Sequence, residues 1–195
     1  MFESITIESF LRAFALIFAI MDPFGSLPVF LVITKKLNEA NRMKAANQAL
    51  IVATAVVLVF LFFGDNILEL FNIRPSDFKI AGGAVLLILG AQLVFGYGKK
   101  EVREIKDYHV AATIIGVPLI TGPGVITSLI VLTASEGVLV TLFAALAALS
   151  INWLILRNSN RLLKVVGMNA IEIASRVFGL LLIAVAVGFI RMGLG

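Results

Sequence analysis

The feature that most constrains this chain is a series of six apolar segments, each long enough to cross a lipid bilayer. A transmembrane helix needs about 20 consecutive, mostly apolar residues, and four of these segments contain no charged residue. The apolar residues surround each segment instead of alternating as in barrel strands. The sequence therefore predicts an all-α polytopic membrane protein, with one transmembrane domain over residues 1–195. Its six helices are expected at about Ala13–Thr34, Ala45–Gly64, Ile80–Gly98, Val110–Ser135, Gly137–Leu156 and Ile171–Ile190.

The composition agrees with a membrane protein. The chain is 60% hydrophobic and 14% charged, whereas a soluble domain is about 45–50% apolar and about 25% charged. It contains no cysteine, which excludes disulfides and thiolate metal sites, and a single histidine, His109. The net charge of +4 comes from basic residues between apolar segments, so we expect contact with lipid and no nucleic-acid binding. We predict no metal and no organic cofactor.

The basic residues predict an orientation in the membrane. Cytoplasmic loops of membrane proteins carry an excess of Lys and Arg. Eleven of the sixteen basic residues follow the first, third and fifth segments. We therefore expect these three connections in the cytoplasm and both termini outside. The eleven are Lys35, Lys36, Arg42, Lys44, Lys99, Lys100, Arg103, Lys106, Arg157, Arg161 and Lys164.

The two halves of the chain resemble each other. Placing Asp22–Thr34 over Thr121–Thr133 without gaps pairs Gly25 with Gly124, and it also pairs two valines and the final threonines. Only the first and fourth segments are heavily interrupted by proline and glycine. Because each half would hold three spans, the second half must enter the membrane from the opposite face. The sequence predicts an inverted 3+3 repeat with broken helices 1 and 4, over residues 1–98 and 108–195 approximately.

Prolines and glycines cluster at Asp22–Pro28 and again at Thr121–Gly124. Proline removes a backbone hydrogen bond, so both helices are expected to open there and to meet near the midplane. Half-helix N-termini offer amides to a carboxylate, and exposed carbonyls suit an ammonium group, so a zwitterionic amino acid fits. The predicted substrate-binding residues are Asp22, Pro23, Phe24, Gly25, Thr121, Gly122, Pro123 and Gly124.

Asp22 is the only acidic residue in the first apolar segment, and a carboxylate is costly at that depth. Three functional roles are open for it: a ligand of Na⁺, a carrier of H⁺, or a partner of a substrate ammonium. The structural alternative is a helix cap that accepts hydrogen bonds from amides near Gly25 and Ser26. We assign ion coupling to Asp22. Three further polar residues within the spans are interpreted as interhelical hydrogen-bond partners; these are Asn47, Gln92 and Asn152.

Two motifs, at Met21–Phe30 (MDPFGSLPVF) and Pro118–Ile126 (PLITGPGVI), resemble those of the MarC family of six-span membrane proteins. The resemblance covers essentially the whole chain. It implies a plasma-membrane protein with an inverted three-plus-three repeat. It also implies kinship with SnatA-type carriers of small neutral amino acids such as glycine and alanine.

These features favour a secondary transporter of small neutral amino acids, coupled to Na⁺ or H⁺. An exporter of a small metabolite or drug with the same fold is the alternative, because uptake and export share this architecture. A passive channel is less favoured, since cation pores often carry rings of acidic residues. The sequence contains no GxxxxGK[ST] phosphate loop, so a nucleotide-driven pump is not favoured. The spans contain no cluster of catalytic residues, so an enzyme is not favoured either. The oligomeric state is left open.

Overall fold

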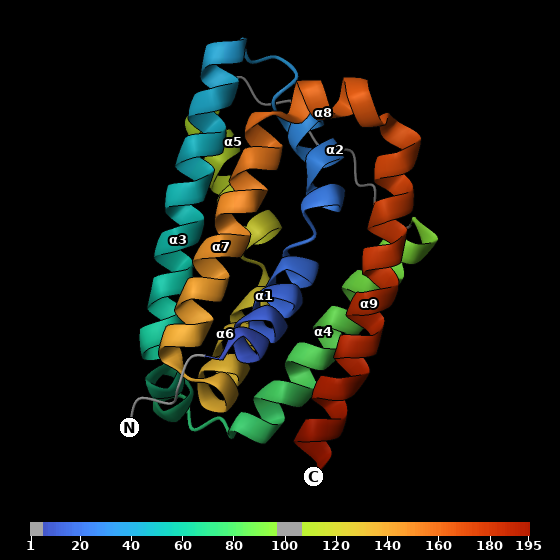
Figure 1. The fold of residues 1–195 in the computed structure, drawn as a ribbon. Coiled ribbons are helices and arrows are strands. Elements are labelled where there is room, and N and C mark those ends of the chain that lie inside the picture. The colour runs from blue at the N-terminus through green and yellow to red at the C-terminus, as the bar shows by residue number, and fades with distance from the viewer. Residues whose placement is uncertain (1–5, 97–106) are drawn as a thin grey trace.

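The computed structural model describes residues 6–96 and 107–195, and the described part of the chain is helical throughout, joined by short turns. Figure 1 shows the elements as a bundle in which most helices run between the same two ends. The elements are α1 (Ile7–Met21), α2 (Pro23–Ile33), α3 (Glu39–Leu70), α4 (Pro75–Phe95), α5 (Tyr108–Ile114), the π-helix η1 (Ile115–Ile120), α6 (Pro123–Glu136), α7 (Val138–Arg157), α8 (Ser159–Val166) and α9 (Met168–Leu194).

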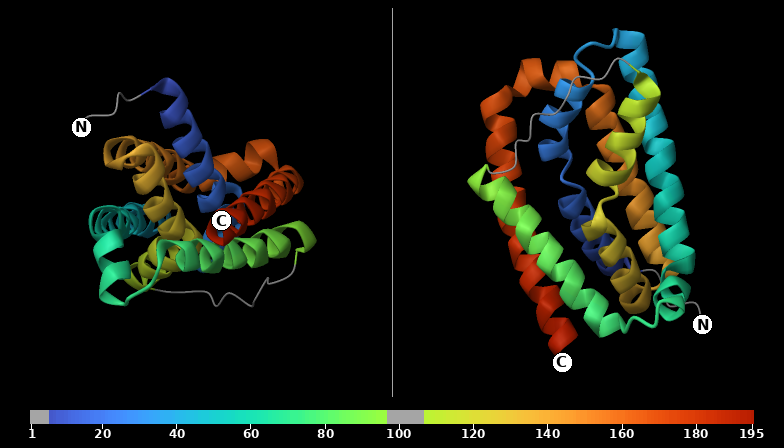
Figure 2. Two further views of the ribbon diagram at one scale, coloured as in Figure 1. Left: turned by 90° about the horizontal axis from the view of Figure 1, so that it is seen from below. Right: turned by 180° about the vertical axis from the view of Figure 1, so that it is seen from behind.

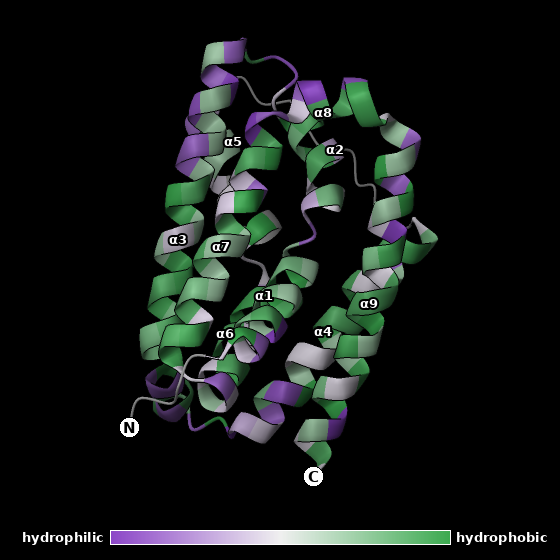
Figure 3. Cartoon of the chain, viewed as in Figure 1, coloured by the Kyte–Doolittle hydropathy of each residue, from purple (hydrophilic) through white to green (hydrophobic). Residues whose placement is uncertain are grey.

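The described helices confirm an all-α, multi-pass membrane protein. Five are long and apolar enough to cross a membrane, counting α1 and α2 as one. The fourth predicted span consists instead of shorter apolar helices on either side of an interruption. Hydrophobic residues fill the middle of the bundle and hydrophilic residues gather at its ends (Figure 3). Large side chains such as Phe62, Phe63 and Leu180 are exposed on the outer surface, where lipid would cover them.

The helices extend beyond the apolar segments that predicted them. The predicted Ala45–Gly64 lies inside α3, which runs from Glu39 to Leu70. Apolar composition marks only the part of a helix that lies in hydrocarbon, and the polar ends of α3 continue past it. The short helix α8 follows α7, where we expected only a loop. Its leucines pack on the core while Arg161 and Lys164 are exposed, a pattern too short to register as a span.

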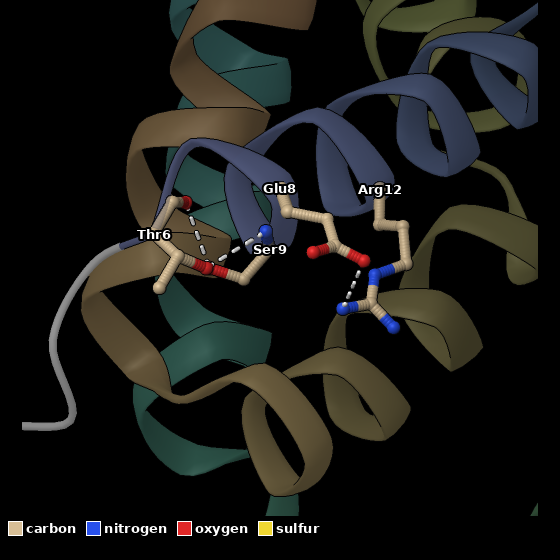
Figure 4. A network of polar contacts seen from close by, with 4 residues as sticks. All are labelled: Thr6, Glu8, Ser9 and Arg12. Carbon is tan, nitrogen blue, oxygen red and sulfur yellow. Dashed lines mark hydrogen bonds and ion pairs between the residues drawn. The ribbon is translucent and has the colours of Figure 1, made fainter.

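A polar network fixes the start of α1 (Figure 4). The amide of Ser9 donates to Oγ1 of Thr6 at 3.1 Å, which caps the helix. Oγ of Ser9 donates in turn to the carbonyl of Thr6 at 2.9 Å. One turn on, Arg12 lies 3.4 Å from Glu8. The bond from the amide of Ser9 satisfies a donor that has no partner inside the helix. With this cap, α1 begins at Ile7, six residues before the predicted Ala13.

Both ends of the described chain lie at one end of the bundle, and α8 lies at the opposite end (Figures 1 and 2). In space α1 packs on α7, and α3 packs on both α5 and η1. Of the basic residues predicted for the cytoplasmic side, those on α3, α7 and α8 lie at the α8 end. The four in 99–106 lie outside the described residues.

The most extensive helix contact among the described residues joins α4 and α9, which are antiparallel and meet through glycines. A Cβ atom on Gly90 would lie 2.7 Å from the carbonyl oxygen of Gly179. A Cβ atom on Gly179 would lie 2.9 Å from the carbonyl oxygen of Gly90. Small residues allow two backbones to approach closely in a membrane, so this contact depends on the absence of both side chains.

Candidate functional site

The first break lies at a single residue, Asp22, which ends α1 and begins α2. Its backbone is left-handed, with φ 39° and ψ 69°. Its amide donates to the carbonyl of Ala19 at 3.2 Å, and its own carbonyl accepts from the amide of Ser26 at 3.0 Å. Its Oδ1 accepts from the amide of Gly25 at 3.0 Å. Pro23 follows at the first helical position, where a missing N–H has no consequence.

The capping alternative for Asp22 is therefore realised, and the carboxylate still has a second oxygen. The side chain is buried, with an exposed fraction of 8%. A Cβ atom on Gly25 would collide with Oδ2 of Asp22, so this glycine makes room for the carboxylate. Capping therefore orients the acidic group beside the break, which is compatible with each functional role left open above.

Pro28 does not take part in the break, contrary to the predicted interruption over Asp22–Pro28. It lies inside the continuous helix α2. A proline there cannot donate a hydrogen bond to the carbonyl four residues earlier, which belongs to Phe24. The first turn of α2 is therefore short of one donor, although the helix persists.

The second break lies at Thr121 and Gly122, between η1 and α6, within the predicted interruption. The amide of Thr121 donates to the carbonyl of Gly116 at 3.2 Å, five residues earlier, and its Oγ1 donates to the same oxygen at 2.8 Å. The π-helix, a form that is frequent at functional sites, was not among the expected elements. The sequence feature that could have indicated this irregularity is Pro118, which has no N–H with which to continue an α pattern.

The two half-helices start in the same way. Pro23 and Pro123 both occupy the first turn, after the cap residues Asp22 and Gly122. The gapless overlay of the sequence paired Asp22 with Thr121, one residue away from the match that the helix starts give. Because glycine has no side chain, α6 has no side-chain cap. Of these two half-helices, only α2 is capped by a carboxylate.

The two breaks lie close together inside the bundle. α1 contacts α6, and α2 contacts η1. A Cβ atom on Gly124 would lie 3.0 Å from Cγ2 of Ile20, two residues before Asp22. The predicted site residues are thus brought to one region, near mid-height of the bundle (Figure 1). Asp22, Pro23, Thr121 and Gly124 are buried, Phe24, Gly25 and Gly122 are half-buried, and Pro123 is exposed.

The helix α9 closes one side of the first break. The ring centroid of Phe178 lies 5.9 Å from that of Phe18 in α1 and 5.4 Å from that of Phe24 in α2. On the same side, Cδ2 of Leu93 in α4 would lie 3.2 Å from a Cβ atom on Gly25. Apolar side chains therefore seal this part of the site.

Two polar residues near this region were not predicted as site residues. Asn152 on α7 is fully buried, and neither polar atom of its side chain has a hydrogen-bond partner among the described residues. Ser175 on α9 is buried, and its hydroxyl is likewise unpartnered in the described part of the chain. The predicted interhelical bond is confirmed for Asn47, which accepts from Nε1 of Trp153 at 2.8 Å. It is wrong for Asn152.

Elsewhere, the described residues show weaker candidates for a binding site. A depression of about 350 Å³ lies at the corner between α3 and α4, remote from the breaks, and is lined by residues such as Asp65, Glu69 and Arg74. Within residues 6–96 and 107–195, no group of three His, Cys, Asp or Glu side chains could hold a metal ion.

The fold and the site define an integral, multi-pass α-helical membrane protein with two interrupted helices at its centre. Its sequence belongs to the MarC family of integral membrane proteins, whose profile matches residues 7–195. The UPF0056 membrane protein MJ1677 of Methanocaldococcus jannaschii is 34% identical over 96% of this chain and 97% of its own length. The UPF0056 membrane protein YhcE of Escherichia coli K12 is 31% identical over 95% of this chain and 91% of its own length. No solved structure matches the chain significantly.

Proposed function

We propose that this protein is a secondary transporter of small neutral amino acids, such as glycine and alanine, in the plasma membrane. One observation carries the proposal: two half-helices begin beside each other in the buried centre of the bundle, and one of them is capped by a buried carboxylate. Irregular backbone at membrane depth is tolerated only where it is buried in protein or lines a cavity. Discontinuous helices form the substrate sites of many secondary transporters.

The chemistry of the breaks suits a zwitterion. The first-turn amides of Phe24 and Gly124 have no partner inside their own helices, and both helix starts carry partial positive charge. A substrate carboxylate would accept from these amides. Asp22 would take the ammonium group or the coupling ion, Na⁺ or H⁺, through its second oxygen. Because the region is lined by buried residues, the side chain of the substrate would have to be small.

An inverted repeat accounts for the packing of the helices and is part of the proposal. If the first three spans are exchanged for the last three, the α1–α7 contact becomes the contact of α5 and η1 with α3. The same exchange turns α2–α9 into α6–α4, and it maps α4–α9 onto itself. All of these contacts are present, which supports two related halves that rock against each other around a fixed site.

The orientation follows from the charge. We propose that the α8 end, which carries the basic residues of α3, α7 and α8, faces the cytoplasm. Both termini would then lie outside.

Reconstitution into liposomes tests the function. Purified protein should take up labelled glycine and alanine, and separate Na⁺ and pH gradients should reveal which ion drives accumulation. Uptake equal to that of protein-free liposomes under every gradient would contradict the proposal. Uptake only from the cytoplasmic face, with the gradient reversed, would identify the exporter.

A further inference from the structure

Two buried polar side chains flank the first turns of α2 from different helices. The helix α7 contacts both α1 and α2, so its inner face passes the break between them. Asn152 lies fourteen residues along α7, and Met21 lies fourteen residues along α1, with both helices starting at the same end (Figure 1). At about 1.5 Å per residue, both have risen about 21 Å along their axes. Asn152 therefore lies at the level of the break or just beyond it.

Ser175 lies on a different helix, α9. It lies one turn before Phe178 on the same face of α9, and Phe178 contacts both sides of the break through Phe18 and Phe24. The chain direction of α9 places Ser175 on the α2 side of Phe178 (Figure 1). Both α7 and α9 contact α2, so the two side chains come from helices that both pack against it.

Neither side chain has a structural partner among the described residues. Asn152 has an exposed fraction of 0% and Ser175 of 8%, and three polar atoms are left unpaired, namely Oδ1 and Nδ2 of Asn152 and Oγ of Ser175. Buried polar groups are almost always hydrogen-bonded, and each exception calls for an explanation. Asn47 and Ser150, by contrast, both make hydrogen bonds.

We propose that Asn152 and Ser175 bind the polar groups of the amino-acid substrate, an inference that rests on the proposed function. The carboxamide of Asn152 offers a donor and an acceptor side by side. A zwitterion satisfies both, because its ammonium donates to Oδ1 and its carboxylate accepts from Nδ2. A bare cation would use only the oxygen and leave Nδ2 unpaired. Ser175 supplies a further donor to the carboxylate.

The test compares Asn152→Leu with the control Asn47→Leu. The side-chain amide of Asn47 already has a hydrogen-bond partner, Nε1 of Trp153. Binding of labelled glycine and alanine is measured in nanodiscs, together with the melting temperature without amino acid. Asn152→Leu should weaken binding roughly tenfold or more, because hydrogen bonds to charged groups are lost. It should also raise the melting temperature, because an unpaired buried amide is removed. Asn47→Leu should lower the melting temperature and keep the affinity.

Two further variants, Ser175→Ala and Asn152→Asp, and one control, Ser150→Ala, keep the test decisive if Asn152→Leu does not fold. Ser175→Ala should weaken binding, whereas Ser150→Ala on α7 should not. Asn152→Asp should also weaken glycine binding, because a carboxylate faces the substrate carboxylate. Unchanged affinity in Asn152→Leu and Ser175→Ala would overturn the inference and leave the proposed function standing. Retained or tighter binding by Asn152→Asp would overturn it in favour of a cation site. Wild-type protein that binds neither amino acid would contradict the proposed function itself.

Discussion

At the scale of single residues, Asp22 has an observed role as a helix cap and a proposed role in transport. One carboxylate oxygen caps α2 through the amide of Gly25, while the backbone at Asp22 is left-handed. Asparagine caps helices about as well as aspartate and tolerates this backbone conformation. Charge can therefore be removed here without removing the cap, which makes the two roles separable.

Asp22→Asn should fold with a change in unfolding free energy of under about 1 kcal/mol and should abolish uphill accumulation in liposomes. If exchange of internal for external glycine survives, Asp22 couples the ion. If exchange and binding are both lost, Asp22 contacts the substrate, since a charge-assisted bond is about twice as strong as a neutral one. A fully active, gradient-driven variant would reduce Asp22 to its capping role.

Gly25→Ala tests whether the carboxylate needs its present position. A Cβ atom there collides with the Asp22 side chain, so the cap must break at a cost of about 1 kcal/mol and the carboxylate must move. We expect lost transport with a modest fall in the melting temperature. Gly188→Ala is the control, because a Cβ atom on Gly188 meets nothing within 4 Å. Wild-type transport by Gly25→Ala would show that the orientation of Asp22 is unimportant.

The sequence alone singles out Asp22 as a candidate site residue, because a carboxylate in an apolar segment is rare and costly. It does not single out Asn152 or Ser175, because an uncharged polar residue in a span usually finds a partner on a neighbouring helix. Only the packing reveals that Asn47 has such a partner and Asn152 has none.

At the scale of elements, the α4–α9 pair depends on close backbone contact. Gly179→Ala should separate the helices, because its Cβ atom would lie 2.8 Å from that of Leu93 and 2.9 Å from the carbonyl oxygen of Gly90. Such overpacking costs about 1–3 kcal/mol, which a lowered melting temperature in detergent would report. Gly188→Ala on the same helix should be neutral or slightly stabilising. Equal melting temperatures for the two variants would contradict tight packing at Gly179.

Proline and glycine predicted where two helices open, but not the form of the opening. Pro23 and Pro123 begin half-helices, as expected from their preference for the first turn. Pro28 lies within α2 without breaking it, and the chain before Thr121 forms a π-helix. The difference depends on the tertiary packing around each proline, which local sequence does not specify.

At the scale of the whole molecule, hydropathy alone predicted five long apolar helices in the right order, because hydrocarbon imposes helix on every crossing segment. The fourth predicted span consists of shorter apolar helices instead. The pairing of helices was not predicted, since apolar segments offer many equivalent partners. The orientation stays a prediction from charge, and the absence of native cysteines makes it testable.

Single cysteines at positions 74 and 161 should report opposite sides of the membrane. Arg74 and Arg161 are exposed at opposite ends of the bundle. In intact cells an impermeant maleimide should label Arg74→Cys, and it should label Arg161→Cys only after permeabilisation. The reverse pattern would place the α8 end outside.

Counterflow tests the central claim, transport by alternating access at the two breaks, most directly. Liposomes holding the protein are loaded with unlabelled alanine, and labelled glycine is added outside at low concentration without any ion gradient. A carrier returns to the outside faster when it is loaded, so labelled glycine should rise transiently above its external concentration and then fall. Simple equilibration, unchanged by the internal alanine, would identify a channel and contradict this account.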